Sequence, residues 1–423
     1  MSDDSTNRPP VRTSTPQLDR NGPIANVNNA EIMLMTLAGV EDMLGWDVFY
    51  DRPILWHPVP VPDAGGDAFP AKYDEPVPLN DNDLVGIRVY LQQVGQMMYL
   101  RGGDSDAAVM RVAKRRPYHP VKTYLESLVW DGVERIGGGS GEAPSWLKTW
   151  VGAENNEYTR VVGRISLVAM IARIYSPGCK YDYVPIFEGG QGAKKSTFLL
   201  ILTQPWFSDC LPCDIESKDA SLHLKGLWGI ELGELAQFKR AQMEELKRFV
   251  SRQREKYRPP YGRMEVEEPR SCVFFGTTNE ETYLSDVTGN RRFFPVKIGI
   301  VDEIGLAQIR DQLLAEALAA FRAGEAWWPE GTFEDDHARQ EQAQRMDVDP
   351  WAEKILAYVR NRDRLSYSGI AESSLGIETK NLNNFHRDRI KAVLIQAKWE
   401  FRKIAGARYW MNPVKKGGGL VGG

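Results

Sequence analysis

The chain has 423 residues, of which 42% are hydrophobic and 26% are charged. This is the composition of a globular protein with room for more than one domain. The formal net charge of −4 does not by itself point to nucleic acid. No apolar run approaches the about 18 residues of a membrane span, and four scattered cysteines do not form a disulfide framework. We expect a cytoplasmic protein with no membrane partner.

The first 180 residues are predicted to hold a tail, a small domain and a linker. Residues 1–27 are rich in Ser, Thr, Pro, Asn and Asp without apolar periodicity, which is typical of a disordered tail. Residues 28–135 are predicted to form a mostly helical domain, because apolar residues recur at helical spacing in 30–44 and 84–98. Residues 136–180 are predicted to be a glycine-rich linker and a helical segment that leads into the next domain.

Residues 181–330 alternate between short apolar runs and helical patterns. The runs at 183–187, 227–230 and 272–275 are predicted to be buried strands, and helices are predicted at 196–202 and 304–322. Strands that alternate with helices are typical of an α/β domain with a largely parallel sheet.

The C-terminal part is predicted to begin with a linker at 331–349, where acidic residues and Gln are frequent. Residues 350–413 are predicted to form helices at 351–359, 368–375 and 388–398 and a hairpin at 401–411. That order of elements is typical of a winged-helix domain, whose third helix enters a major groove. Residues 414–423 are expected to be a flexible tail.

A glycine-rich loop follows the first strand of the α/β domain and opens its first helix, the context of a phosphate-binding loop. It consists of Gly189, Gly190, Gln191, Gly192, Ala193, Lys194, Lys195, Ser196 and Thr197. In such a loop Lys195 would reach the β- and γ-phosphates and the Ser196 hydroxyl would bind Mg²⁺. Lys194 stands where the pattern has a glycine. The alternative is a glycine-rich turn that caps a helix.

Acidic and amide side chains follow the next two predicted strands. Glu231 would bind the metal, and Glu234 would polarise the attacking water as a general base. Asn279 would orient water beside the γ-phosphate. Each has a structural alternative, because glutamates three residues apart are common on solvated surfaces and Asn is a frequent turn residue.

Paired arginines, Arg291 and Arg292, precede another apolar run. An arginine inserted into the site of a neighbouring subunit stabilises developing phosphate charge, which requires an oligomer. The alternative is a surface arginine that forms ion pairs.

Two local basic clusters are candidates to bind DNA. Residues 247–263 hold seven basic residues and one acidic residue, and residues 380–416 hold ten and two. The first mixes basic and aromatic side chains, which suits phosphate contact and base stacking: Lys256, Arg258, Tyr261 and Arg263. The third helix of the second contributes Arg387, Arg389, Lys391 and Lys398, while Ile390, Val393, Leu394 and Ala397 would face the core. The alternatives are a structural turn at the first and a protein-binding winged helix at the second.

Together these features resemble the virulence-associated protein E family of phage and prophage replication proteins, whose motor domain is similar to superfamily 3 helicases of the AAA+ class. The resemblance covers roughly residues 115–330. Besides the loop, it rests on Tyr118-His119-Pro120-Val121, Tyr124-Leu125, Trp130-Asp131-Gly132-Val133, Pro177-Gly178-Cys179-Lys180, Ser217-Lys218-Asp219-Ala220, Tyr257-Arg258-Pro259-Pro260-Tyr261-Gly262-Arg263, Gly276-Thr277-Thr278-Asn279 and Gly289-Asn290-Arg291-Arg292-Phe293-Phe294-Pro295-Val296.

The resemblance implies roles for residues already singled out. Lys195 and Ser196 would be the Walker A pair and Glu231 and Glu234 the Walker B acids. Asn279 would sense the γ-phosphate, and Arg291 or Arg292 would be the finger supplied in trans. The resemblance also implies a hexameric ring and a β-hairpin that lines its channel, with arms at 256–263 and 264–268.

The expected fold is therefore an α/β P-loop NTPase core with a helical N-terminal domain and a C-terminal winged-helix domain. The expected activity is ATP-Mg²⁺ hydrolysis by a homo-oligomer, coupled to translocation on or unwinding of DNA during phage or mobile-element replication in the bacterial host. Single-stranded DNA would occupy the channel and the winged helix would bind duplex. The alternative is a non-motor DNA-binding initiator or regulator that uses ATP as an assembly switch, which the Lys194 departure keeps open. A small-molecule kinase would leave the paired arginines and the basic C-terminal helix unexplained.

Overall fold

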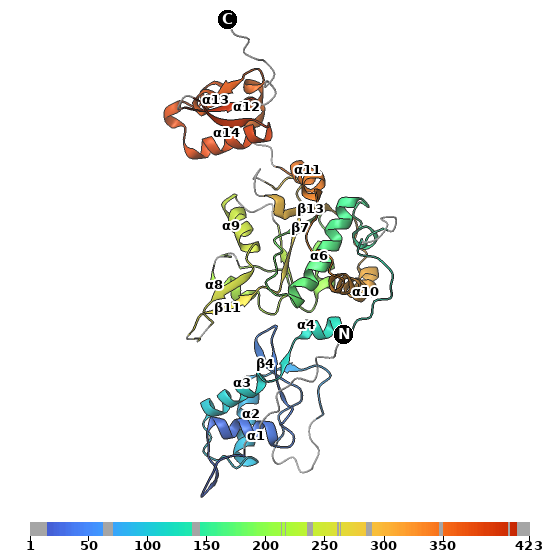
Figure 1. Cartoon of the computed structure of the whole chain (residues 1–423), viewed down its shortest axis with the longest axis vertical. Coiled ribbons are helices and arrows are strands. Elements are labelled where there is room, and N and C mark those ends of the chain that lie inside the picture. The colour runs from blue at the N-terminus through green and yellow to red at the C-terminus, as the bar shows by residue number, and fades with distance from the viewer. Residues whose placement is uncertain are drawn as a thin grey trace. The chain divides into compact units, whose positions relative to one another are not determined.

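The computed structural model describes residues 15–61, 71–137, 144–212, 214–215, 217–234, 240–259, 262, 264–284, 290–346, 350–404 and 407–412. Contacts divide the chain into two units, Met1–Ser127 and Leu128–Gly423, and each is described by itself. Figure 1 labels their elements.

The first unit combines helices with a small sheet. Its helices are α1 (Val27–Thr36), α2 (Asp81–Gln93), α3 (Gly102–Ala113) and α4 (Pro120–Ser127). Strands β3 (Leu44–Asp47), β4 (Arg52–Leu55), β5 (Val77–Pro78) and β6 (Pro117–Tyr118) form a sheet in the order β5-β4-β3-β6. The sequence analysis did not predict this sheet, because strands of two to four residues are too short to show a period of two.

Part of the predicted N-terminal tail has a defined structure. Strands β1 (Leu18–Asp19) and β2 (Gly22–Pro23) pair antiparallel. The buried Asn29 side chain accepts the backbone N–H of Gln17 at 2.9 Å and donates to the carbonyl of Gln17 at 2.7 Å. The prediction of a disordered tail is therefore wrong for residues 15–27, and residues 1–14 lie outside the described residues.

The second unit contains a five-stranded parallel sheet, as the α/β prediction expected. Its strands are β7 (Val184–Glu188), β8 (Phe207–Ser208), β9 (Gly229–Leu232), β12 (Val273–Thr278) and β13 (Phe293–Lys297). They lie in the order β13-β7-β12-β9-β8, and every pairing is parallel. The loops after β7, β9 and β12 therefore leave the same edge of the sheet.

Both faces of this sheet are covered, which agrees with its nearly continuous apolar strands. The helices of this region are α5 (Trp146–Val151), α6 (Glu157–Tyr175), α7 (Lys195–Thr203), α8 (Lys218–His223), α9 (Arg240–Val250) and α10 (Glu303–Arg322). On one face α7 packs against β9 and β12, and α10 packs against α6 and α7. On the other face Ile186 and Phe274 share a buried cluster with Leu246 and Phe249 of α9. Figure 1 shows α6 and α10 beside one another.

The predicted linker at 331–349 is instead packed against the sheet. A π-helical turn (Glu334–Ala338) leads into α11 (Arg339–Gln344), which packs on β13. Gln342 is buried and donates to the carbonyl of Phe293 at 2.9 Å, and Arg345 is also buried. Acidic composition alone suggested exposure, but these polar side chains are buried because they have hydrogen-bond partners. Residues 347–349 lie outside the described residues.

The C-terminal part contains the elements predicted for residues 350–413. Helices α12 (Ala352–Val359), α13 (Tyr367–Leu375) and α14 (Asn384–Gln396) pack together with a three-stranded sheet. Its strands β14 (Arg364–Leu365), β15 (Glu400–Ile404) and β16 (Ala407–Met411) lie in the order β14-β16-β15. Ile390, Val393 and Leu394 are buried, as predicted, and Ala397 is partly buried. Residues 413–423 lie outside the described residues.

No helix in the part of the chain that the structure describes combines the length and the apolar character needed to cross a bilayer.

Candidate functional site

The glycine-rich loop connects the end of β7 to the start of α7. Gly192 and Lys194 both have left-handed backbones, with φ of 83° and 61°. Lys194 is the N-terminal capping residue of α7, and no side chain caps this helix. The first-turn N–H groups, up to Thr197, therefore face the loop without a capping oxygen, which is the arrangement that binds anions at helix N-termini.

Lys195 lies across this loop. Its Nζ donates to the carbonyls of Gly189 at 2.7 Å and Gly190 at 3.1 Å, and to Oδ1 of Asn279 at 2.6 Å. Burial lowers the pKa of the lysine, and the nearby charge of Glu231 opposes that shift. An ammonium group has three donors, so these oxygens occupy all of them. A phosphate group that entered the loop would compete for the same donors.

Ser196 and Glu231 are in direct contact. Oε1 of Glu231 accepts hydrogen bonds from the Ser196 hydroxyl at 2.8 Å and from the Thr277 hydroxyl at 2.6 Å. Glu231 is only 4% exposed, and its other oxygen, Oε2, is buried without a partner. A buried carboxylate oxygen without a partner is costly, and a cation at this point would satisfy it.

The oxygen atoms of Ser196 and Glu231 suit a Mg²⁺ ion that is bound together with a nucleotide. Among the described residues, no three His, Cys, Asp or Glu side chains gather to hold a metal. An ion beside Ser196 and Glu231 would therefore need ligands from phosphate and water, which is the usual way proteins bind Mg²⁺ with nucleotides.

Glu234 lies two residues beyond β9, at the same edge of the sheet. It is exposed and has a left-handed backbone, with φ of 51°. Residues 235–239, which follow it, lie outside the described residues. Its position is compatible with contact to water near the loop, and its role as general base stays a prediction.

Lys194, the departure from the pattern, points to α10. Its Nζ forms an ion pair with Glu303 in the first turn of that helix. The side chain of Lys194 is half exposed, so it does not fill the space in which phosphates are expected. The loop tolerates a lysine here because its side chain leaves the loop.

Three residues that the sequence analysis did not single out meet behind the loop. Glu188, the last residue of β7, accepts three hydrogen bonds from Arg345, at 2.8, 3.1 and 2.9 Å, and one from the Tyr283 hydroxyl at 2.6 Å. Burial, reinforced by the charge of Glu188, holds the pKa of Tyr283 well above its usual value. Arg345 lies 157 residues from Glu188 in the stretch predicted to be a linker, so no local pattern indicated it.

A cavity of about 410 Å³ opens between this cluster and the loop. Its lining residues are Glu188, Gly189, Gly190, Asn279, Glu280, Glu281, Lys297, Gln344 and Arg345. It therefore joins the start of the glycine-rich loop to the residues that follow β12 and α11. A ligand in the loop would have room to extend toward Lys297 and Arg345.

Arg291 and Arg292 lie at the opposite edge of the sheet. Both fall in a 3-10 turn (Asn290–Arg292) directly before β13, whose first residue pairs with the first residue of β7. At about 3.3 Å per residue, the five residues of β7 separate them from the loop of the same chain. Arg292 donates to the Ser251 hydroxyl at 2.8 Å and lies 3.4 Å from Asp182. Arg291 is exposed, and its action in a neighbouring chain stays a prediction.

The expected hairpin before β12 is present. Strands β10 (Arg254–Tyr257) and β11 (Val266–Pro269) pair antiparallel. The arms are shorter than predicted: β10 ends at Tyr257, and Pro259, which cannot donate to a ladder, lies beyond it. Lys256 is exposed and pairs with Glu265 at 3.0 Å. Arg258 donates to the carbonyl of Gly262 at 2.6 Å, while Tyr261 and Arg263 lie outside the described residues.

The basic residues predicted for α14 divide between two sides of the helix. Arg387 and Lys391 are exposed on α14. Lys398 is also exposed, but it lies beyond the helix, which ends at Gln396 and not at the predicted 398. Arg389 instead lies with its guanidinium 3.6 Å from the centre of the Trp351 ring, where a cation–π contact engages it. The structure therefore separates Arg389 from the exposed basic side chains of the same helix.

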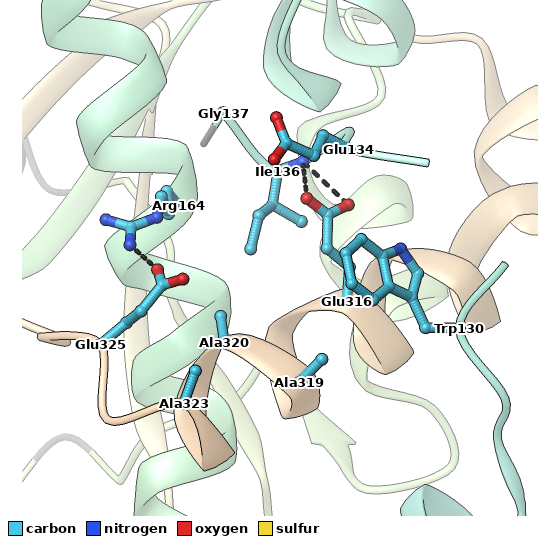
Figure 2. Close-up of a pocket in the computed structure, with 10 residues that line it drawn as sticks. All are labelled: Trp130, Glu134, Ile136, Gly137, Arg164, Glu316, Ala319, Ala320, Ala323 and Glu325. Atoms are coloured by element: carbon cyan, nitrogen blue, oxygen red, sulfur yellow. Dashed lines mark hydrogen bonds and ion pairs between the residues drawn. The ribbon is translucent and has the colours of Figure 1, made fainter. Parts of the chain in front are cut away.

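A further cavity, of about 450 Å³, lies between residues 130–137, α6 and α10 (Figure 2). Glu316 of α10 accepts the backbone N–H groups of Arg135 at 2.7 Å and Ile136 at 3.1 Å. Gln312, one turn earlier, bonds the backbone of residues 129 and 131. These bonds attach the segment to α10, which explains why the two units divide at Ser127 and not at residue 135. No predicted site residue lines this cavity.

Comparison with known families gives one match. The model of the virulence-associated protein E-like domain matches residues 125–347, just over half of the chain. The match includes the glycine-rich loop, Glu231 and Glu234, the hairpin, the paired arginines and Arg345. No curated protein matches the chain.

Solved structures of one protein are similar over most of the chain. The apo structure of the NrS-1 C-terminal region has 14% identity and a TM-score of 0.39, covering 87% of this chain and 95% of that chain. An A-form apo structure of the same region has 13% identity and a TM-score of 0.38, covering 87% and 96%. TM-scores this low do not establish a shared fold, so the family model carries the assignment.

Proposed function

The chain belongs to the virulence-associated protein E-like family, and on that premise we propose that it is an ATP-driven motor that moves along or unwinds DNA during phage or mobile-element replication. The observation that carries the proposal is the meeting of Lys195, Asn279, Ser196 and Glu231 at one edge of the sheet, around a helix N-terminus that no side chain caps. That constellation is what phosphoryl transfer from a nucleotide requires.

The residues of the site would divide the work of hydrolysis. Bound ATP would supply the phosphoanhydride bond, and Mg²⁺ would neutralise charge on its phosphates. Lys195 would exchange its carbonyl and amide partners for phosphate oxygens, and Ser196 and Glu231 would hold the metal. Glu234 would accept a proton from water that Asn279 helps to orient.

An oligomer completes the proposed site. Arg291 is exposed at the edge of the sheet away from its own loop, so it would act in the loop of a neighbouring chain. An arginine supplied in trans stabilises the transition-state charge and makes turnover depend on assembly. A homo-oligomeric ring, a hexamer by family resemblance, would meet this requirement.

DNA would bind at the two basic regions. The hairpin tip, with Lys256 and Arg258, would contact the phosphates of a single strand in the ring. The Lys256–Glu265 pair is exposed, so solvent screens the attraction between its two charges. Phosphate could therefore replace Glu265 at little cost. The C-terminal part, which we propose is a winged helix, would bind DNA through α14.

A second candidate is a non-motor initiator or regulator that uses ATP as an assembly switch. The Lys194–Glu303 ion pair favours it, because it ties the loop to α10 and would slow the rearrangements of a turnover cycle. The two candidates differ in whether ATP is consumed.

Measurement of ATP turnover and native mass at matched protein concentrations tests the proposal. We expect single-stranded DNA to stimulate ATP turnover, and we expect turnover only where an oligomer is present. The Lys195→Ala substitution should abolish it. The Lys180→Ala variant, a lysine outside the site, is the matched control. Nucleotide-dependent assembly with negligible turnover would contradict the motor and support the switch.

A further inference from the structure

A cavity of about 650 Å³ lies in the C-terminal part of the chain, beside α14. Its walls come from the start of α13, the turn before α14, one side of α14, and strands β15 and β16. The lining residues are Tyr367, Ser368, Thr379, Leu382, Asn384, Arg387, Asp388, Lys391, Phe401 and Arg408. The volume lies within the range of about 300–1,000 Å³ that small-molecule sites occupy.

Three cations converge on this cavity. Arg387 and Lys391 are one turn apart on α14, and Arg408 comes from β16 on the opposite wall. All three are exposed. Among the residues that the structure describes, none of the three forms an ion pair. Cations without a carboxylate partner, placed around one hollow, favour a phosphate-bearing ligand.

An exposed aromatic ring lies on the same wall as Arg408. Phe401 is 43% exposed although it contacts Tyr367 and Trp410, with ring centres 5.5 and 4.9 Å apart. An exposed aromatic face among cations is the combination on which unpaired bases stack. Asn384 and Asp388 add amide and carboxylate groups able to pair with the edge of a base.

The shape of the cavity distinguishes an unpaired base from a base pair. Asn384, Arg387, Asp388 and Lys391 recur at helical spacing and form one side of α14. A helix that reads duplex must enter the major groove, but this side of α14 lines a hollow whose opposite wall carries Phe401 and Arg408. A volume of about 650 Å³ is that of a small-molecule site, which suits one nucleotide and not a duplex.

We propose that this cavity binds an unpaired nucleotide of a DNA single strand, with the base against Phe401 and the flanking phosphates between Arg387, Lys391 and Arg408. The inference rests on the proposed function for the identity of the nucleic acid. The inference goes beyond the proposed function because the C-terminal part would bind a single strand and not only duplex DNA.

Equilibrium binding of the full chain to a fluorescent single-stranded oligonucleotide, without ATP, tests the proposal. Phe401→Ala and Arg408→Ala are expected to weaken binding, Phe401→Ala by about 5- to 100-fold because base–aromatic stacking is lost. The matched controls are Phe385→Ala and Arg402→Ala. Phe385 is 62% exposed on α14, Arg402 lies on β15, and neither lines the cavity. Both controls are expected to bind as the parent chain does.

A second variant separates stacking from folding. Phe401→Leu keeps an apolar side chain against Tyr367 and Trp410 but removes the aromatic face, so weaker binding at an unchanged melting temperature supports stacking. Binding equal to that of the parent chain would overturn it. A 2-aminopurine base in the oligonucleotide is expected to lose fluorescence in the parent chain and to keep it in Phe401→Leu.

Two competitors distinguish other ligands. Duplex of the same length is expected to compete poorly, and equal losses for duplex and single strand in Phe401→Ala would overturn the proposal. Excess ATP is expected not to compete, and full competition by ATP would show a site for free nucleotides instead. Because the comparisons between variants and the duplex competition contain no ATP, their outcomes do not depend on whether the chain hydrolyses it.

Discussion

At the scale of single residues, Lys194 is the point at which this chain departs from the usual phosphate-binding loop. Its backbone is left-handed, with φ of 61°, a conformation that costs an L-residue roughly 1–2 kcal/mol and glycine almost nothing. The ion pair with Glu303 on α10 offsets part of this cost. This ion pair is a tether to a neighbouring helix, at the position where the usual pattern has glycine.

Replacement of Lys194 by Gly tests this tether. We expect stability to rise by about 0–1 kcal/mol, because relief of strain exceeds the extra chain entropy of glycine, and nucleotide binding to persist. Glu303→Ala is expected to weaken nucleotide binding in the parent chain but not in Lys194→Gly, as measured by melting temperature and nucleotide titration. Loss of binding in Lys194→Gly would show that the lysine itself contacts the ligand.

Glu231 at the end of β9 and Glu234 beyond it are expected to respond differently to loss of charge. Glu231→Gln keeps an oxygen for Ser196 and Thr277 but loses charge beside the metal, so we expect turnover to need more Mg²⁺. Glu234→Gln should lower kcat by about 10²–10⁴-fold, the usual contribution of a general base, at unchanged Mg²⁺ dependence. Turnover measured against Mg²⁺ concentration separates them, and matching profiles would refute the division of roles.

Most of the site residues that could be predicted were indicated by local sequence patterns. Lys195, Ser196 and Asn279 follow strands and Glu231 lies near the end of one, and parallel strands bring such positions to one edge. Partners distant in sequence left no such signal. Arg345 belongs to the site only because α11 folds back onto β13.

At the scale of elements, β7, β9, β12, α7 and α10 of the α/β region and the order of elements in the C-terminal part were predicted, whereas β8, β13, α8 and α9 were not. Helix α14 begins at Asn384, four residues before the predicted start, because Asn383 caps it by accepting the N–H of His386 at 2.9 Å. The short strands of the first unit and the packed stretch 334–346 were missed, since neither shows clear periodicity.

The turn before β13 provides a prediction about neighbouring chains. Arg291→Ala and Lys195→Ala are each expected to abolish turnover alone. An equimolar mixture should recover activity, because about a quarter of interfaces then join an intact loop to an intact arginine. Arg322→Ala, an arginine at the end of α10, is the control for loss of charge. Absence of recovery in mixed oligomers of normal mass would argue against action in trans.

At the scale of the whole molecule, the two units carry separate cores and different chemistry. The predicted nucleotide site, hairpin and C-terminal cavity all lie in the second unit. The first unit contributes a partly buried titratable group, His119, which stacks on Phe49 with ring centres 5.2 Å apart. Burial, reinforced by the charge of Lys122, lowers the pKa of His119 to about 4.

This histidine should make the first unit sensitive to acid. Its folded pKa of about 4 is below the ordinary 6.5, so the unfolded chain binds the extra proton and stability falls as pH drops from 6.5 toward 4. The loss is at most about 3 kcal/mol. His119→Asn keeps an acceptor for the N–H of Lys122 and should flatten the dependence of the urea midpoint on pH. An unchanged slope would assign the acid sensitivity to other groups.

The most direct test of the motor is ATP-dependent displacement of streptavidin from the end of a biotinylated single strand. We predict that the parent chain displaces streptavidin and that displacement stops when ATP is replaced by a non-hydrolysable analogue. The Glu234→Gln variant should still bind DNA but should not displace streptavidin. ATP hydrolysis without displacement from either end of the strand, or DNA binding without hydrolysis, would contradict the account.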